Sequence, residues 1–328
     1  MKRFLPLMTA AVLMLLLLTG CGTQTPEATS APATEAPTAN EAKELVFVTG
    51  NGEGTYYRFG TVLAETIAEK TDTKLTVKTS GGARENIEAL RDGKAQVALT
   101  QSDVVAYAAA GERLFDRKAE NIRVIANLYD EQIQIVTLNP KLGSVSDLKG
   151  KTVSVGENGS GGYFNALDVL EAYGMTEQDI TPVYHSFSDS VEALQNGTID
   201  AAFVVAGAPT AAISKLTASA KVCLISLDEA HIEKLLAASS HYRKATISRR
   251  SYGTDTDINT IAVTAVMVAR EDVPEEDVYN IVSGIFKNLD VITAQYYIGA
   301  ELDAEKAAQA VGMPYHPGAE KFFRETEK

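Results

Sequence analysis

The stretch "VTGNGEGTYYRFG" at residues 48–60 decides the fold of this chain. An apolar, strand-like run at 44–48 precedes its turn, and a helix-like pattern follows from Thr55. A helix that begins after a glycine-rich turn offers unpaired backbone N–H groups and the positive end of its dipole to an anion. The stretch therefore predicts a strand, an anion-binding turn and a helix, and leaves open whether a cofactor or a solute is bound.

Strand and helix patterns alternate along the rest of the chain. Strands are predicted at 44–49, 74–79, 95–100, 122–127, 132–138, 152–156, 182–185, 199–205, 221–226 and 260–268. Helices are predicted at 55–70, 83–92, 102–110, 161–173, 188–196, 208–218, 228–238, 275–297 and 303–310. Such alternation predicts the α/β class with a mostly parallel or mixed sheet.

A repeat relates two parts of the chain. "ENIEALRDGKAQVALT" at 85–100 aligns without gaps on "DSVEALQNGTIDAAFV" at 189–204. "LVFVTGNGEGTYY" at 45–57 likewise resembles "KTVSVGENGSGGYF" at 151–164. Convergence of two βα units is the alternative explanation. Two α/β lobes with matching glycine turns predict a ligand cleft between them, because ligands bind outside the carboxyl ends of strands and at domain interfaces.

The first 43 residues predict a targeting segment and a tether. Lys2 and Arg3 precede an apolar run, and "LLTGC" ends it, which is typical of a secretory signal at 1–20. The ending resembles the bacterial lipobox and predicts that Cys21 is lipidated. Residues 21–43 then form a disordered tether, because Pro, Ala, Thr, Ser and Glu cannot bury a core. The predicted location is the outer face of the cell membrane, to which the lipid anchor alone attaches the protein.

Charge and cysteine content narrow the possible partners. The formal net charge is -13, which argues against nucleic acid and anionic lipid as partners. Only Cys223 remains besides Cys21, so we expect no internal disulfide, and Cys223 lies in an apolar strand pattern typical of an inert core residue.

The sequence contains partial matches to motifs of enzymes and metal sites, but each match lacks a residue that the motif requires. Thr55 stands where the dinucleotide fingerprint begun by Gly50 and Gly52 needs its third glycine. Asn158 stands where a nucleophile elbow around Ser160 needs glycine. The four histidines share no metal-ligand spacing, and "DTDIN" at 255–259 lacks the later glycine and glutamate of a calcium loop. We therefore expect binding without catalysis, and neither a cofactor nor a metal.

Several segments together resemble the TAXI-type solute-binding proteins of tripartite ATP-independent periplasmic (TRAP) transporters. The matching segments are "TGNGEGTYYRFG" at 49–60, "SGGARENIEALRDGKAQVALTQSD" at 80–103, "DLKGKTVSVGENGSGGYFNALDVLEAYG" at 147–174, "AFVVAGAPTAAI" at 202–213 and "HPGAEKFFRE" at 316–325. The resemblance spans nearly all of the chain after the tether.

The resemblance implies a two-lobed periplasmic-binding-protein-like fold, in which a βα sheet layered with helices forms each lobe and a central cleft is hinged. Lobe 1 is expected at 44–140 plus 251–328 and lobe 2 at 141–250, with hinge crossings near 137–144 and 250–260. It implies a monomeric receptor that delivers a small carboxylate, such as glutamate or a related organic acid, to a TRAP permease. The alternative is the receptor of an ATP-driven importer for a phosphonate-like or heterocyclic ligand.

Carried over by position, the resemblance also implies a set of solute-binding residues. These are Thr49, Gly50, Tyr56, Tyr57, Ser80, Asn86, Gln101, Ser102, Ser160, Gly161, Asn165, Gly207 and Pro209. Tyr56 and Tyr57 are adjacent on a helix and cannot face the same way, so one packs and the other faces the cleft. Arg58 and Arg84 lie near the turns, either as partners of the solute or as solvated helix residues.

Overall fold

The computed structural model describes residues 44–113 and 115–326. The predicted signal, Cys21 and the tether lie outside the described residues. The strands are β1 (Leu45–Val48), β2 (Leu75–Lys78), β3 (Val97–Gln101), β4 (Ile122–Thr137), β5 (Thr152–Ser154), β6 (Thr181–Val183), β7 (Ala201–Ala206), β8 (Cys223–Leu224), β9 (Arg243–Ile247) and β10 (Ile258–Arg270).

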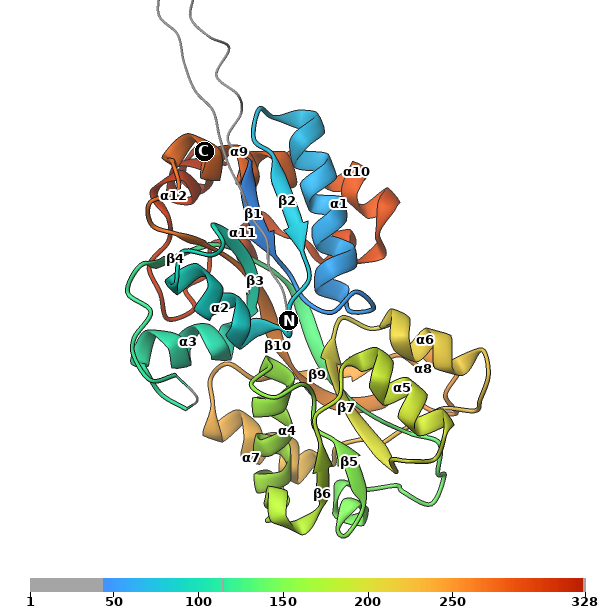
Figure 1. The fold of residues 1–328 in the computed structure, drawn as a ribbon. Coiled ribbons are helices and arrows are strands. Elements are labelled where there is room, and N and C mark those ends of the chain that lie inside the picture. Colours follow the sequence, from blue (N-terminus) through green and yellow to red (C-terminus); the bar gives the residue numbers. More distant parts are fainter. Residues whose placement is uncertain (1–43, 114, 327–328) are drawn as a thin grey trace, which may run out of the picture. The chain divides into compact units, whose positions relative to one another are not determined.

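Helices connect most of these strands (Figure 1). They are α1 (Thr55–Lys70), α2 (Ala83–Arg91), α3 (Ser102–Ala110), α4 (Gly161–Ala172), α5 (Phe187–Gln195), α6 (Ala211–Thr217), α7 (Glu229–Ala238), α8 (Arg249–Tyr252), α9 (Glu275–Phe286), α10 (Leu289–Gln295), α11 (Ala304–Ala307) and α12 (Pro317–Thr326). Single 3₁₀ turns lie at Val145–Leu148, Glu177–Asp179 and Tyr297–Glu301.

The strands form one mixed sheet in the order β2-β1-β3-β10-β4-β7-β5-β6. β1 runs parallel to β2 and β3, and β5 runs parallel to β6 and β7. The two long strands β4 and β10 pair antiparallel with each other in the middle of the sheet. We call the part built on β1–β3 the first lobe and the part built on β5–β7 the second lobe; β4 and β10 run through both.

Alternate residues of each strand bury opposite faces of the sheet. In the first lobe, Phe47 packs on the side of α1 and α9, whereas Val48 packs on the side of α2 and α3. In the second lobe, Phe203 of β7 packs on the side of α4 and α7, whereas Val204 packs on the side of α5 and α6. This alternation follows from the twofold period of a strand. The predicted fold class, two α/β lobes layered with helices, is confirmed.

The predicted repeat corresponds to equivalent units of structure. α2 and β3 cover the first copy, and α5 and β7 cover the second. β1 lies between β2 and β3 in the sheet, just as β5 lies between β6 and β7. The two lobes therefore present the same strand, turn and helix device in the same order.

The prediction of two strands at 122–127 and 132–138 is wrong. A single strand, β4, runs from Ile122 to Thr137. The polar residues "DEQ" at 130–132 suggest an exposed break, but Tyr129 and Glu131 are buried inside the strand.

The predicted single helix at 275–297 is wrong as well. It is divided into α9 and α10, because Asn288 has a non-helical backbone.

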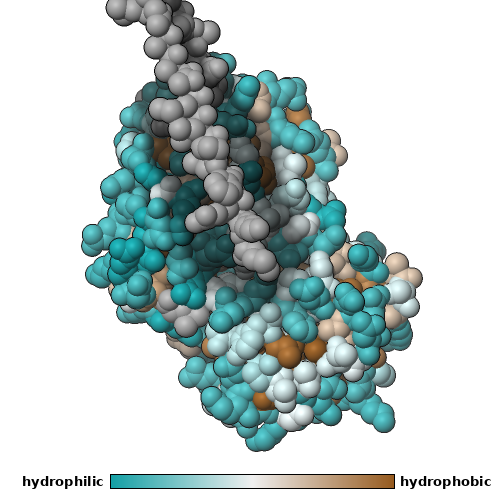
Figure 2. Space-filling view, viewed as in Figure 1, coloured by the Kyte–Doolittle hydropathy of each residue, from teal (hydrophilic) through white to brown (hydrophobic). Residues whose placement is uncertain are grey.

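The visible face of the molecule is mainly hydrophilic outside the grey atoms (Figure 2). Among the described residues, Tyr184 and Tyr297 are the large hydrophobic side chains that are exposed. No helix in the described part of the chain combines the length and the apolar character that crossing a bilayer requires.

Candidate functional site

A small cavity of about 60 Å³ lies where the strands of both lobes end. Its walls are the turns after β1, β2 and β5, the ends of β3 and β7, the start of α5 and the middle of β4. The lining residues are Gly50, Asn51, Gly54, Thr55, Tyr56, Gly81, Gly82, Ala83, Gln101, Glu131, Glu157, Ser160, Gly161, Gly162, Phe187, Val205 and Ala206. This is the place that an α/β sheet offers to a ligand.

Four helices begin at the wall of this cavity: α1, α2, α4 and α5. The first two begin after Gly54 and Gly82, neither of which has a side chain to cap the helix. Their first N–H groups therefore lack the side-chain acceptor that usually satisfies them. In α4 the Ser160 hydroxyl accepts the N–H of Tyr163 at 3.1 Å. Four positive dipole ends around one small space favour an anion.

Glycine is favoured at two positions of these turns, for different reasons. Gly82 has φ +117°, a conformation that residues with a Cβ rarely adopt. At 161 a Cβ would overlap Oε1 of Gln101, so glycine allows the start of α4 to lie against the end of β3. By contrast, a Cβ at Gly162 would meet Val205 at 3.5 Å, an ordinary contact. The start of α4 in the second lobe thus lies directly against Gln101 and Ala83 of the first lobe.

Glu131 is the most deeply buried acidic group of the cavity wall. Its side chain is 2% exposed, and its Oε2 accepts the Tyr56 hydroxyl at 2.8 Å. Burial raises the pKa of Glu131 well above its ordinary value, and it raises the pKa of Tyr56 as well. The pair therefore retains its protons more strongly than the same groups in water.

Glu157 lies on the second-lobe turn that leads into α4. Partial burial raises the pKa of Glu157 to about 7, and the neighbouring carboxylates of Glu85 and Asp189 add to the shift. Its backbone carbonyl accepts the N–H of Ser160 at 2.8 Å, which holds the turn in place.

Five of the residues implied by the resemblance line the cavity: Gly50, Tyr56, Gln101, Ser160 and Gly161. Gln101 is 3% exposed, and its Oε1 has no hydrogen-bond partner among the described residues. An unpaired buried carbonyl is costly, so it marks a place where a donor is missing.

The other implied residues lie outside the cavity wall, and several of them hold the surrounding structure. The Asn86 amide donates to the backbone oxygens of Thr49 (2.5 Å) and Leu99 (2.7 Å). The Thr49 hydroxyl donates to the carbonyl of Lys78 at 2.8 Å. Ser102 Oγ accepts the N–H of Thr264 at 3.2 Å.

Five implied positions remain, and none of them lines the cavity: Ser80, Gly207, Pro209 and Tyr57, described here, and Asn165, described below. Ser80 Oγ accepts the N–H of Gly82 at 3.1 Å, which shapes the turn before α2. The carbonyl of Gly207 accepts the Thr55 hydroxyl at 3.4 Å, and the carbonyl of Pro209 accepts the Tyr297 hydroxyl at 2.7 Å. Tyr57 is half-buried, and its carbonyl accepts the hydroxyl of Thr61.

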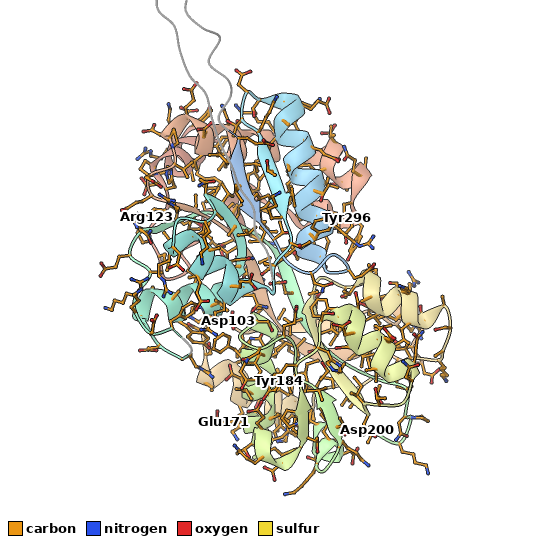
Figure 3. All side chains as sticks on the ribbon, in the orientation of Figure 1. Asp103, Arg123, Glu171, Tyr184, Asp200 and Tyr296 are labelled. Carbon is orange, nitrogen blue, oxygen red and sulfur yellow. The ribbon has the colours of Figure 1, made fainter. Side chains whose placement is uncertain are left out.

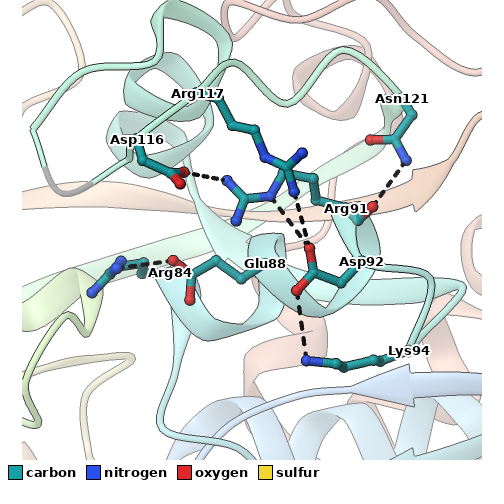
Figure 4. A network of polar contacts seen from close by, with 8 residues as sticks. All are labelled: Arg84, Glu88, Arg91, Asp92, Lys94, Asp116, Arg117 and Asn121. Atoms are coloured by element: carbon teal, nitrogen blue, oxygen red, sulfur yellow. Dashed lines mark hydrogen bonds and ion pairs between the residues drawn. The ribbon is translucent and has the colours of Figure 1, made fainter.

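Tyr56, Tyr57, Arg58 and Arg84 differ in their position relative to the cavity. Of the adjacent tyrosines, Tyr56 lines the cavity and Tyr57 does not. Arg58 pairs with Glu53 at 2.9 Å, and Arg84 pairs with Glu88 at 2.9 Å along α2 (Figure 4). Neither arginine lines the cavity.

Beside the cavity, a polar chain connects the lobes. Asn165 of α4 donates to Asp103 of α3 at 2.8 Å, and Asp103 lies where the two groups of helices meet (Figure 3). The same amide donates to the Tyr242 hydroxyl at 3.0 Å, which in turn donates to Asp168 at 2.6 Å. Asp168 also pairs with Arg113 at 2.6 Å. We call these five residues the interlobe clasp.

Sequence reasoning missed Glu131, Glu157, Phe187, Val205 and Ala206. Glu157 stands inside the second glycine turn, so its position was a usable signal. Glu131 stands between Asp130 and Gln132 in β4, so the local sequence did not distinguish it from an exposed residue. Nothing in the strand period indicates that Val205 and Ala206 border a cavity.

No cluster of metal-ligating side chains occurs within residues 44–113 and 115–326. The cavity wall holds hydroxyl, amide and carboxyl groups and free helix N–H groups, which suit binding of a small polar molecule.

The chain matches the NMT1-like family over residues 47–326. Among solved structures, MatC from Rhodopseudomonas palustris with bound malate is 14% identical with a TM-score of 0.55, and the match covers 87% of this chain and 96% of that one. The aliphatic sulphonate binding protein SsuA from Escherichia coli is 16% identical with a TM-score of 0.47, over 86% of this chain and 83% of that one. At such identities the likeness to MatC concerns the fold alone.

Proposed function

Because the chain belongs to the NMT1-like family, we propose that it is an extracytoplasmic receptor that binds a small carboxylate and delivers it to a TRAP membrane permease. The observation that carries this proposal is the convergence of four helix N-termini on one cavity between the lobes. A carboxylate there accepts N–H groups that the uncapped helices leave free. The protein acts as a receptor rather than an enzyme.

The solute is held from both lobes. The turns after β1 and β2 approach from the first lobe, and the turn before α4 approaches from the second. Binding therefore favours the closed arrangement of the lobes, since only that arrangement gives the solute both sets of contacts. A permease that recognises the surface of the closed form then binds the solute-bound receptor in preference to the empty receptor.

A substitution at Gly161 tests the site. In Gly161→Ala the new Cβ overlaps the end of the Gln101 side chain and lies 3.2 Å from the Cβ of Ala83, so Gln101 has to move within the wall of the solute cavity. We expect affinity for the solute to fall at least about tenfold, which corresponds to roughly 1.4 kcal/mol. Isothermal titration calorimetry measures this, with the molecule that co-purifies with the protein, identified by mass spectrometry, as the titrant.

Gly143→Ala is the matched control, because Gly143 lies outside the cavity wall and a Cβ there meets nothing within 4 Å. Thermal unfolding confirms that both variants are folded. Equal affinity of Gly161→Ala and Gly143→Ala would place the solute elsewhere.

The proposed anchor is the acylated Cys21 followed by the tether. Several acyl chains hold a protein to a membrane far more strongly than the marginal binding of one. We expect Cys21→Ala to yield a folded domain that is released from the membrane. Cell fractionation measures the released fraction, and equal membrane retention of the variant and the parent contradicts the anchor.

A further inference from the structure

Asp103 is an acidic residue buried where the two lobes meet. It lies in the first turn of α3 and is fully buried. From the second lobe, Asn165 of α4 donates its amide to Oδ2 of Asp103 at 2.8 Å. The preceding residue, Phe164, packs into the first-lobe core on α2 and α3, with its ring 5.5 Å from that of Tyr107. The contact between α3 and α4 therefore encloses an aromatic ring and a carboxyl group together.

The ionisable groups that interact with Asp103 across this contact are acids and phenols. They are Asp168 of α4, Tyr242 before β9, Tyr107 of α3, Tyr56 of α1 and Glu131 of β4. None of these groups carries a positive charge in either protonation state. They therefore leave an ionised Asp103 without a compensating cation.

Basic side chains on the elements around Asp103 have other partners. The pairs are Arg84 with Glu88, Arg113 with Asp168, Arg243 with Asp130, and Lys234 with the carbonyl of Ala172. Burial lowers the pKa of His241, which favours its neutral form. Within residues 44–113 and 115–326, Asp103 itself forms no ion pair.

Two opposing effects act on the carboxyl group. The Asn165 amide and the N–H of Val104, at 2.9 Å, favour the ionised form, as does the start of α3. Burial acts against ionisation and is the larger effect, so the pKa of Asp103 rises to about 6. Asn165 Oδ1 is also buried, without a donor among the described residues. The contact thus has more hydrogen-bond acceptors than donors, which a proton on Asp103 partly corrects.

We propose that Asp103 takes up a proton as the lobes close, so that solute binding is coupled to proton uptake. This inference rests on the closure of the proposed receptor and concerns its regulation, not the chemical class of its solute. In the open arrangement α4 withdraws from α3, water reaches the carboxyl group, and it ionises as an exposed aspartate does. In the closed arrangement the group is enclosed and retains its proton.

Acid favours the closed form. The pKa of Asp103 is about 6 when enclosed and its ordinary value is 3.8, so between these values the closed arrangement holds a proton that the open one has released. Solute affinity therefore rises as the pH falls through this window. From the two pKa values, a change from pH 7 to pH 5 tightens binding about tenfold through this group.

Asp103→Asn tests the coupling, because an amide has the shape of the carboxyl group but does not titrate. Isothermal titration calorimetry at pH 5, 6, 7 and 8, with the co-purified molecule as titrant, compares the variant with the parent. The comparison cancels the titration of the solute and of other acids, such as Glu157. We expect the parent to gain about tenfold more affinity than the variant between pH 7 and 5. We also expect the variant to bind more tightly than the parent at pH 7, since it stays neutral.

Asn165→Leu is a second variant with a different expected effect. It removes the donor that favours the ionised carboxylate, so the pH at which affinity changes should move upward. This variant decides the question if Asp103→Asn does not fold, and thermal unfolding shows which variants are folded. Asp116→Asn, at an exposed acid of the first lobe, is the matched control and should keep the pH dependence of the parent.

The outcomes separate this inference from the proposed function. The same pH dependence in the parent and in Asp103→Asn overturns the coupling and leaves the receptor intact. Weaker binding of Asp103→Asn at every pH also overturns it, because that result shows a carboxylate needed only as an acceptor. So does a downward movement or no movement of the transition in Asn165→Leu. Absence of binding at every pH, together with absence of any co-purified molecule, contradicts the receptor function itself.

Discussion

Glu157 offers a pH-dependent test of the cavity at the scale of a single residue. Its pKa in the folded protein is about 7, above its ordinary value, so the folded state retains a proton that the unfolded chain has released. Between about pH 4.5 and 7 the folded state then binds more protons, and stability falls as the pH rises. Below this window both states are protonated, and above it both are ionised.

We therefore expect Glu157→Gln to gain stability relative to the parent as the pH rises from 5 to 8, when both are free of solute. Urea unfolding of the two proteins at each pH measures the difference in the free energy of unfolding. Glu192→Gln, on the exposed face of α5, should show no such trend. A difference between parent and Glu157→Gln that does not change with pH would show that Glu157 is not in the low-polarity wall described above.

Residues of the glycine turns could be predicted from sequence, whereas acidic residues in the strands could not. Gly50, Ser160 and Gly161 follow from the turn pattern, because a helix start with small residues is recognisable by itself. The role of Asn86 could not be foreseen, since its two bonds to backbone carbonyls depend on how β1 and β3 lie beside α2. The burial of Glu131 likewise depends on partners far away in the chain.

At the scale of elements, most helices and strands could be predicted, and the failures share a cause. The prediction divided β4 into two strands because the polar residues at 130–132 suggested a turn. In the structure, β10 and β7 pair with β4 at these residues, so the strand continues. β9 was missed because its sequence "RKATI" begins with two charged residues and contains only two apolar ones, too few to show the period of a strand. In both cases tertiary contacts override the local pattern.

The interlobe clasp gives a prediction about how α4 and the segment after α3 hold the lobes together. Asp168→Asn weakens its ion pair with Arg113, which joins the first lobe to the second. A partly exposed pair of this kind contributes about 1 kcal/mol or less, so we expect the open arrangement to gain up to about fivefold in population. Calorimetry should show a solute affinity lower by up to the same factor.

Asp116→Asn is the matched control for the clasp, because Asp116 pairs with Arg91 within the first lobe at 3.0 Å (Figure 4). Its affinity should equal that of the parent. Equal effects of the two variants would show that the clasp does not act on closure.

At the scale of the whole molecule, two long strands carry the connection between the lobes. β4 changes its partner from β10 to β7 at Gln132, earlier in the chain than the predicted crossing at 137–144. β10 changes its partner from β9 to β3 between Ala262 and Ala265, later than the predicted crossing at 250–260. The β4–β10 ladder is irregular near Thr264, which favours bending at this level. We propose that the lobes close about this point.

The distance between the lobes, measured with and without solute, tests directly whether the protein closes on its ligand. Spin labels at Asp72→Cys in the first lobe and Asn196→Cys in the second are placed on exposed positions, in a protein without Cys21 and with Cys223→Ser. Pulsed electron resonance then gives the distance distribution. We predict that adding the co-purified solute narrows the distribution and changes its mean, and that Gly161→Ala weakens this change at the same solute concentration. An identical distribution with and without a solute that calorimetry shows to be bound would contradict a receptor that closes on its ligand.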